Sequence, residues 1–253
     1  MTHSMDTAAK NELAEAYSEK GYVVWPQHLT EAQIGSLTEA WENLWNATDE
    51  SENSDDVLYR NHDGQGRIAD RLENVRHKSN VYRELCEESD IKSFAEQLLG
   101  GPCFVLKDKL ITKAPQTSGY DPHQDFAYWS EIGLESDEVL SVAISLDHTS
   151  AEHGPLEICE ALHHSRLPGA PGEELDVDPA VLEGSKRFAF VSKPGGVLFF
   201  HSLAPHFSAK NSATTSRRMF YITYALDKGG EDRVRSEYDA RFERIQKFHR
   251  KAG

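Results

Sequence analysis

The chain has 253 residues, of which 38% are hydrophobic and 27% are charged, a balance typical of a folded globular protein and unlike that of a disordered chain. With 42 acidic and 27 basic residues the formal net charge is −15, which argues against nucleic acid and anionic membranes as partners. The chain has three cysteines without a CxxC pair, and it shows neither an apolar leader nor a run of about 20 apolar residues. These features predict a soluble cytoplasmic protein. We expect one domain over residues 1–253.

The first hundred residues predict helices around one short strand. A polar helix over 6–20 precedes a buried strand at 21–25, and a capping box at 30–33 begins an amphipathic helix. The polar segment 48–66 is expected to be a surface loop, with a lid over a substrate as the alternative. A further helix is predicted at 90–99, before Gly and Pro residues that end it.

From residue 103 onward the pattern changes to short β-rich segments separated by Gly, Pro, Ser and Asn. The predicted strands cover 104–113, 139–147, 155–159, 187–191, 196–202 and 218–226. A charged helix is expected at 231–250. Helices followed by strands, without βαβ alternation, predict an α+β fold whose mainly β core is a sandwich or small barrel. The chain contains no GxGxxG, P-loop or GxSxG element, which argues against the common nucleotide-binding and serine-hydrolase folds.

Two histidines and one aspartate form the pattern that carries most chemical information. His123 and Asp125 are two residues apart, so in an extended segment both side chains would point to the same metal. His206, which follows an apolar strand and a turn, is the third candidate ligand, and His201 competes with it. Two histidines and a carboxylate form the facial triad of non-haem iron(II) oxygenases, which leaves coordination positions open.

Basic residues on two predicted strands offer partners for anions. Arg217 stands eleven residues after His206 at the start of a strand, where a guanidinium would bind the distal carboxylate of 2-oxoglutarate. Strand alternation allows Arg217 or Arg218, but not both, to point inward, and we favour Arg217. Lys107, Lys109 and Lys113 share one face of another strand, which would contact an anionic ligand or form a solvated edge.

Taken together, these motifs resemble those of the phytanoyl-CoA dioxygenase family of Fe(II)/2-oxoglutarate-dependent oxygenases, over roughly residues 15–245. The resemblance rests on four ordered segments: GYVVWPQHLTEAQIGSL, LKDKLITKAP followed by PHQDFAYW, EHGPLEICEALHHS, and His206-x-Ser208-x-x-Asn211 followed by Arg217. Four motifs in the family's order and spacing are more specific than any single one.

The resemblance implies a double-stranded β-helix, also called a jelly roll or cupin-like fold, flanked by N-terminal helices and a C-terminal helix. It implies that His123, Asp125 and His206 bind Fe(II), and that Arg217 and Lys109 bind 2-oxoglutarate. Dioxygen would be the second cosubstrate, with ascorbate a candidate reductant. The implied reaction is hydroxylation of a small molecule with release of succinate and CO2.

The substrate is less defined than the reaction. Small anionic or zwitterionic compounds, such as an aminoalkylphosphonate or an amino acid, and natural-product intermediates all remain open. Residues expected to contact it are Lys107, Lys113, Gln124, Tyr128 and Trp129, although Trp129 would fit the core equally well. Two alternatives stay open: a cupin-like metal-dependent isomerase or hydrolase that does not use 2-oxoglutarate, and a non-catalytic ligand-binding member. The sequence does not specify an oligomeric state.

Overall fold

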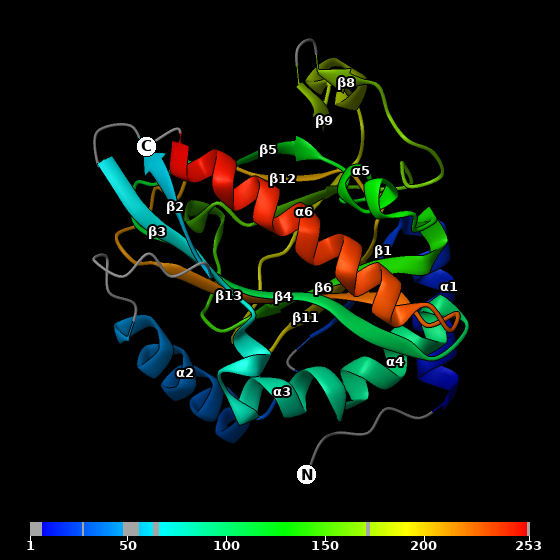
Figure 1. Cartoon of the computed structure of the whole chain (residues 1–253), viewed down its shortest axis with the longest axis horizontal. Helices are drawn as coiled ribbons and strands as arrows, with labels where there is room; N and C mark the ends of the chain where they lie inside the picture. The colour runs from blue at the N-terminus through cyan, green and yellow to red at the C-terminus, as the bar shows by residue number, and fades with distance from the viewer. Residues whose placement is uncertain (1–6, 27, 48–55, 63–65, 171–172, 252–253) are drawn as a thin grey trace.

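A computed structural model describes residues 7–26, 28–47, 56–62, 66–170 and 173–251. Within these ranges two antiparallel sheets pack face to face, with helices outside them (Figure 1). This arrangement is a jelly-roll core in an α+β chain, so the predicted fold class is confirmed.

The larger sheet positions most of the basic side chains of interest. Its described strands are, in spatial order, β1 (Tyr22–Trp25), β11 (Val197–His201), β6 (Val139–Ser145), β13 (Arg217–Leu226), β4 (Cys103–Lys113), β3 (Gly66–Glu73) and β2 (Val57–His62). The smaller sheet contains β10 (Arg187–Ala189), β7 (Leu156–Cys159), β12 (His206–Ser208), β5 (Tyr120–His123), β9 (Glu173–Val177) and β8 (Gly169–Ala170).

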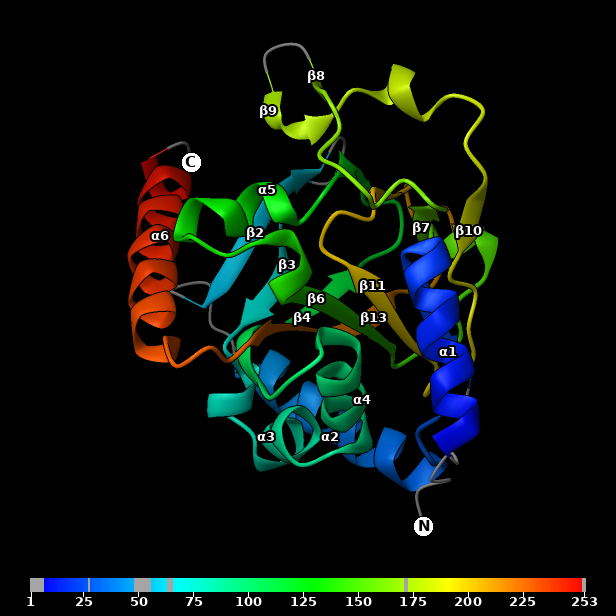
Figure 2. The ribbon, with the colours of Figure 1, turned by 90° about the vertical axis from the view of Figure 1, so that its right-hand side faces the viewer.

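Some of the helices cover the side of the larger sheet that faces away from the smaller one. The described α-helices are α1 (Thr7–Lys20), α2 (Glu31–Asn46), α3 (Asn80–Glu87), α4 (Asp90–Leu99), α5 (Phe126–Trp129) and α6 (Glu231–Lys251). Single turns of 3-10 helix occupy Val75–His77, Ser130–Ile132, Ser136–Glu138, Ala151–His153 and Pro179–Leu182. In Figure 1, α2, α3 and α4 lie on one side of the larger sheet, and β5, β12 and α5 lie on the other. Figure 2 likewise shows α5 on the opposite side of the sheet from α2, α3 and α4.

Strands β6 and β11 of the larger sheet are largely apolar on both faces because both faces are buried. On the helical side Phe199 packs against Trp25 and Phe94, with ring centroids 5.1 Å away in both cases. On the other side Phe200 and Met219 belong to a second buried cluster that includes residues of the smaller sheet. The central strands therefore read as continuous apolar runs in the sequence.

The structure corrects one sequence-based interpretation. Residues 57–62, which lie within the predicted surface loop 48–66, form β2 and pair with β3. Residues 48–55 and 63–65 of that segment lie outside the described residues, so the lid stays a prediction for them. The remaining predicted helices and strands are present with ends shifted by a few residues, and the capping box of Thr30 and Gln33 is confirmed.

Strands β3, β5, β8, β9 and β12 and helices α3 and α5 were not predicted. Strands β5 and β12 have four and three residues, too few for alternation to be recognised, and β3 is rich in charged residues. None of the described helices is long and apolar enough to cross a membrane.

Replacing Phe199 with alanine should lower the free energy of unfolding by about 3–5 kcal/mol, because the ring is fully buried between helices and sheet. Urea denaturation measures this change. Val191→Ala is the control, since that side chain is 52% exposed and its truncation should change stability by less than about 0.5 kcal/mol. Similar losses in both variants would contradict the position of Phe199 in the core.

Candidate active site

Two neighbouring strands of the smaller sheet and one helix bring His123, Asp125 and His206 together. His123 ends β5 and His206 begins β12, and the two residues are direct partners in the antiparallel pairing. Asp125 precedes α5 with φ −54° and ψ −29°, a helical conformation. The extended geometry that we expected for His123 and Asp125 is therefore wrong, because the chain leaves β5 and turns into α5 between them.

The three side chains nevertheless converge. One carboxylate oxygen of Asp125, Oδ1, lies 3.8 Å from Nε2 of His123 and 3.8 Å from Nε2 of His206. The ligand atoms of the three residues all lie within 4.8 Å of one another, and they make up the one such group of three or more residues in the described part of the chain. Two imidazole nitrogens and a carboxylate oxygen at this spacing suit a transition-metal ion.

Backbone carbonyls orient both imidazole rings. Nδ1 of His123 lies 2.8 Å from the carbonyl oxygen of Asp121, and Nδ1 of His206 lies 3.0 Å from that of Ala204. In each ring Nδ1–H donates to the carbonyl, which leaves the lone pair of Nε2 directed at Asp125. The other carboxylate oxygen of Asp125, Oδ2, accepts a hydrogen bond of 2.7 Å from Oγ of Ser141 on β6. Ser141 was not singled out by the sequence, because only sheet pairing brings β6 to this place.

Burial sets the charge state of this group. It lowers the pKa of His206 to about 4, with His123 adding to the shift, so His206 is neutral at pH 7. Burial acts in the opposite direction on Asp125, but His206, His123 and Lys109 outweigh it and lower the pKa of the carboxyl. Neutral imidazole and ionised carboxylate are the forms that bind metal ions.

Arg217 and Lys113 are direct partners in the pairing of β13 with β4, and both are buried. The Nη1 atom of Arg217 donates to the carbonyl of Gly154 at 2.8 Å, while its buried Nε has no hydrogen-bond partner among the described residues. Lys113 donates to three oxygens: those of Gly154 at 3.0 Å, Ser208 at 2.7 Å and Ala209 at 2.6 Å. Lys113 thus uses all three of its donors on the protein, whereas Arg217 has donors left for a ligand.

Arg218 points to the opposite face of β13, as strand alternation requires. Its guanidinium pairs with Asp147 at 2.7 Å and lies 4.8 Å from the ring centroid of Trp41 on α2. The structure therefore places Arg217 between the sheets and Arg218 on the helical side.

Lys107 and Lys109 also face the space between the sheets and do not form a solvated edge. The ammonium group of Lys107 lies 3.0 Å from a carboxylate oxygen of Glu73, which is 1% exposed. The ammonium group of Lys109 lies 5.4 Å from the ring centroid of Tyr221. Burial and the nearby Lys107 and Arg71 lower the pKa of Lys109 to about 8.

Three further residues were expected to line the site, and the structure gives them different surroundings. The side-chain amide of Gln124 donates to the carbonyls of Leu203 and Ser165 and accepts from the amide of Leu167, so it braces loops. Trp129 is 5% exposed and belongs to a core cluster, the alternative that the sequence left open. Tyr128 lies beside the metal group, with its ring centroid 6.3 Å from that of His123.

His201, the competing candidate ligand, is the last residue of β11. It is not part of the group formed by His123, Asp125 and His206. Its ring centroid is 5.3 Å from that of His163 and 6.1 Å from that of Tyr17. Its Nδ1 accepts a hydrogen bond from the amide of Leu203. His201 therefore belongs to an aromatic cluster under α1.

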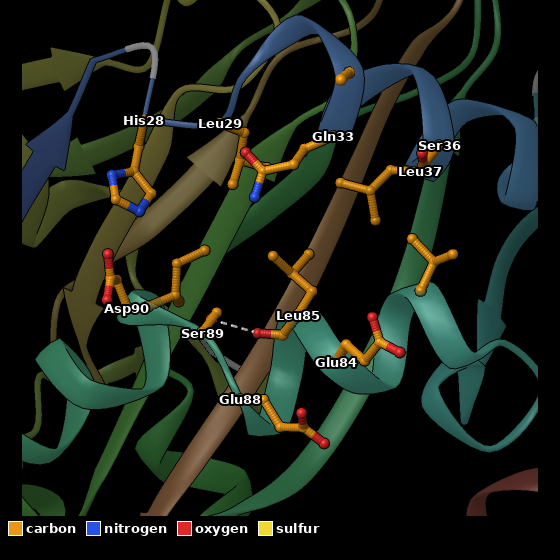
Figure 3. A pocket seen from close by; sticks show the side chains of 13 residues that line it. His28, Leu29, Gln33, Ser36, Leu37, Glu84, Leu85, Glu88, Ser89 and Asp90 are labelled. Atoms are coloured by element: carbon orange, nitrogen blue, oxygen red, sulfur yellow. Dashed lines mark hydrogen bonds between the residues drawn. The ribbon is translucent and has the colours of Figure 1, made fainter. Parts of the chain in front are cut away.

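A separate cavity of about 520 Å³ lies between α2 and the α3–α4 pair (Figure 3). Its lining includes His28 and the carboxylates of Glu84, Glu88 and Asp90. Because these helices cover the outer face of the larger sheet, this cavity is on the opposite side of that sheet from α5, the helix that Asp125 precedes (Figure 2).

We expect His201 to make the metal-free protein less stable in acid. Burial lowers its pKa from 6.5 to about 4, so between these values the unfolded chain binds a proton that the folded chain does not. The resulting stability is complete above pH 6.5 and is lost as the pH falls, by up to about 3 kcal/mol. Urea titrations across this range should show a smaller acid loss in His201→Asn than in the wild type. Val191→Ala, which changes an exposed side chain without a titratable group, should keep the wild-type slope, and identical slopes in all three proteins would refute the assignment.

Comparison with known proteins identifies the family. The model of the phytanoyl-CoA dioxygenase family matches residues 17–219. A methylphosphonate hydroxylase of Gimesia maris is 29% identical over 93% of this chain and 87% of its own length. A 2-aminoethylphosphonate dioxygenase of an uncultured bacterium is 25% identical over 71% of this chain and 70% of its own.

A solved structure supports the fold. EctD from S. alaskensis, determined with 2-oxoglutarate and 5-hydroxyectoine, has a TM-score of 0.72 and 20% identity, over 89% of this chain and 80% of that one. Since the family model covers most of the sequence, the chain belongs to the phytanoyl-CoA dioxygenase family, as its motifs predicted, and it is a 2-oxoglutarate-dependent oxygenase.

Proposed function

We propose that the chain hydroxylates a small anionic molecule at an iron(II) ion bound by His123, Asp125 and His206. The observation that carries this proposal is the convergence of two Nε2 atoms and one carboxylate oxygen within 4.8 Å. This donor set fits iron(II), because two imidazoles and one carboxylate on one side of the ion leave further positions for ligands. Bound iron and 2-oxoglutarate would supply the oxidising chemistry, with dioxygen consumed, succinate and CO2 released, and ascorbate a candidate reductant.

Arg217 is the proposed partner of the distal carboxylate of 2-oxoglutarate. Its Nε is buried and has no hydrogen-bond partner in the described ranges of the chain, and the bond from Nη1 to Gly154 holds the guanidinium in one orientation. Lys113 donates to the same carbonyl and so steadies the acceptor. A planar guanidinium fixed in this way would bind a carboxylate through two parallel hydrogen bonds.

Apolar and aromatic side chains would keep water away from the reacting atoms. The ring of Phe200 lies edge-on to His206 at 4.8 Å, and Met219 and Ala143 are buried in the same cluster. Low polarity around the ligands strengthens the electrostatic interactions inside the site.

The proposed substrate class comes from the relatives and from the charge of the site. Two relatives are named for phosphonates, and Lys107 and Lys109 present ammonium groups to the space between the sheets. The match to the family disfavours a cupin-like isomerase or hydrolase without 2-oxoglutarate. A complete set of ligand side chains disfavours a non-catalytic member.

We further propose that residues 1–253 form one catalytic domain that works in the cytoplasm, where its three buried cysteines would stay reduced.

Iron(II) and 2-oxoglutarate added to the protein without oxygen should produce a visible charge-transfer band. His123→Ala should abolish the band by removing an iron ligand, and Arg217→Ala should raise the 2-oxoglutarate concentration needed for it by about tenfold or more. The matched controls are His201→Asn and Arg218→Ala, whose side chains face other parts of the fold. Metal binding by the wild type without any band would overturn the proposal.

Ser141→Ala should weaken metal binding by about 10–100-fold, because it removes the hydrogen bond that orients Asp125. Competition with a chelator, under nitrogen, measures the affinity for iron(II). Ser145→Ala is the control: it lies on the same strand and bonds to the carbonyl of Asp147 instead. Equal affinities in the two variants would show that Ser141 does not orient the ligand.

A further inference from the structure

The wall of the site formed by β3 and β4 carries one buried and three half-buried charged side chains. Glu73 is the direct partner of Lys109 in the pairing of these strands, and Arg71 is the partner of Ile111. Directly opposed residues point to the same face of a sheet. Arg71, Glu73, Lys107 and Lys109 therefore all face the smaller sheet, as Tyr221, the β13 partner of Lys109, does.

The carboxylate of Glu73 pairs with two of the three cations in this wall. Glu73 lies 3.0 Å from the ammonium of Lys107 and 3.5 Å from Nε of Arg71. That Nε is buried and makes no hydrogen bond to the described residues. Within the same part of the chain Lys109 has no ion pair within 4 Å, and its contact is with the ring of Tyr221. With all four side chains ionised, the wall has a net charge of about two positive units.

The carboxylates of Asp70 and Asp125, near this wall, interact with other groups. Asp70 accepts a hydrogen bond from the hydroxyl of Tyr120 and pairs with Arg60 at 3.7 Å. Asp125 lies in the metal group and accepts from Ser141. A buried positive charge that protein carboxylates do not balance is costly, and an anionic ligand would offset that cost.

The position of the wall separates it from Arg217. Lys107 pairs with Thr223, and Thr223 pairs with Ser141, so this row crosses from the wall to the side chain that holds Asp125. Two strand spacings correspond to about 10 Å. Along β13, Arg217 lies six residues before Thr223 and four before Tyr221, so it is roughly 20 Å from the row of Lys107 and roughly 13 Å from the row of Lys109. Arg71 is in the row of Ile111 and Met219, closer along the strand but two strand spacings away across the sheet. The two lysines of the wall and Arg217 therefore suit two different anions.

We propose that Arg71, Lys107 and Lys109 form an anion subsite that holds the doubly charged head group of the substrate, with its carbon end toward the metal group. The three cations match the three oxygens of a phosphonate, and Arg71 adds a planar pair of donors. Glu73 is a positioning residue that holds Arg71 and Lys107. This inference rests on the proposed function, and it assigns Lys109 to the substrate and leaves 2-oxoglutarate to Arg217.

The test measures binding to the protein loaded with iron(II) and 2-oxoglutarate under nitrogen. The probes are methylphosphonate, the singly charged methanesulfonate and the neutral dimethyl ester of methylphosphonate, titrated by calorimetry. We expect methylphosphonate to bind about tenfold more tightly than methanesulfonate, and the ester to bind more weakly still. Arg71→Met should weaken methylphosphonate binding by about tenfold or more, with Arg71→Lys in between.

Arg67→Met is the matched control, because Arg67 is exposed on the same strand and stacks on Tyr59. It should leave phosphonate binding unchanged. The charge-transfer band with 2-oxoglutarate should persist in Arg71→Met, which shows that the variant is folded and separates this inference from the proposed function. Lys109→Met should likewise weaken phosphonate binding and spare 2-oxoglutarate binding.

Several results would overturn the subsite. They are equal affinities for the phosphonate and its neutral ester, wild-type phosphonate affinity in Arg71→Met, or a loss of 2-oxoglutarate affinity alone in Lys109→Met. Any of these in a wild-type protein that shows the band would leave the proposed function standing. Absence of the band from the wild type would instead remove the proposed function on which the subsite depends.

Discussion

The antiparallel register of β13 with β4 and β6 is the constraint on which the site depends. It directs Arg217, Met219 and Tyr221 toward the smaller sheet and Arg218 and Phe220 toward the helices. A slip of one residue would exchange the two sets, so that Arg217 would turn toward the helices and Phe220 toward the smaller sheet. Apolar burial on both faces makes such a slip costly, because each set of side chains fits only its own side.

The basic residues between the sheets differ in how the protein satisfies them. Lys113 donates to three protein oxygens and so belongs to the framework. Arg217 keeps a buried donor for a ligand, and Lys107 shares a single carboxylate with Arg71. The chain as a whole has a net charge of −15, so this internal positive charge is a local property of the site. The number of protein oxygens that each cation contacts thus distinguishes side chains that stabilise the fold from side chains suited to binding an anionic ligand.

The metal group depends on the smaller sheet although each of its strands is short. β12 has three residues and β5 has four, and their pairing sets His206 opposite His123. Carbonyls of Asp121 and Ala204, two residues before each histidine, orient the rings. Asp125 reaches the same point from α5 and is held by Ser141 of the larger sheet. The group therefore requires both sheets to be packed together.

The sequence by itself determined the class of fold, the long apolar strands and the candidate ligands. Runs such as those of β11 and β13 are recognisable because burial on both faces leaves continuous apolar letters, and His123, Asp125, His206 and Arg217 combine residue types that few other roles require. Only the tertiary structure decided that Lys113 holds backbone carbonyls, that Trp129 is core, and that Ser141, Arg71 and Glu73 adjoin the site. These roles arise from pairing between strands that are far apart in the chain. Which residues become neighbours then depends on strand register and packing, and no local sequence pattern predicts it.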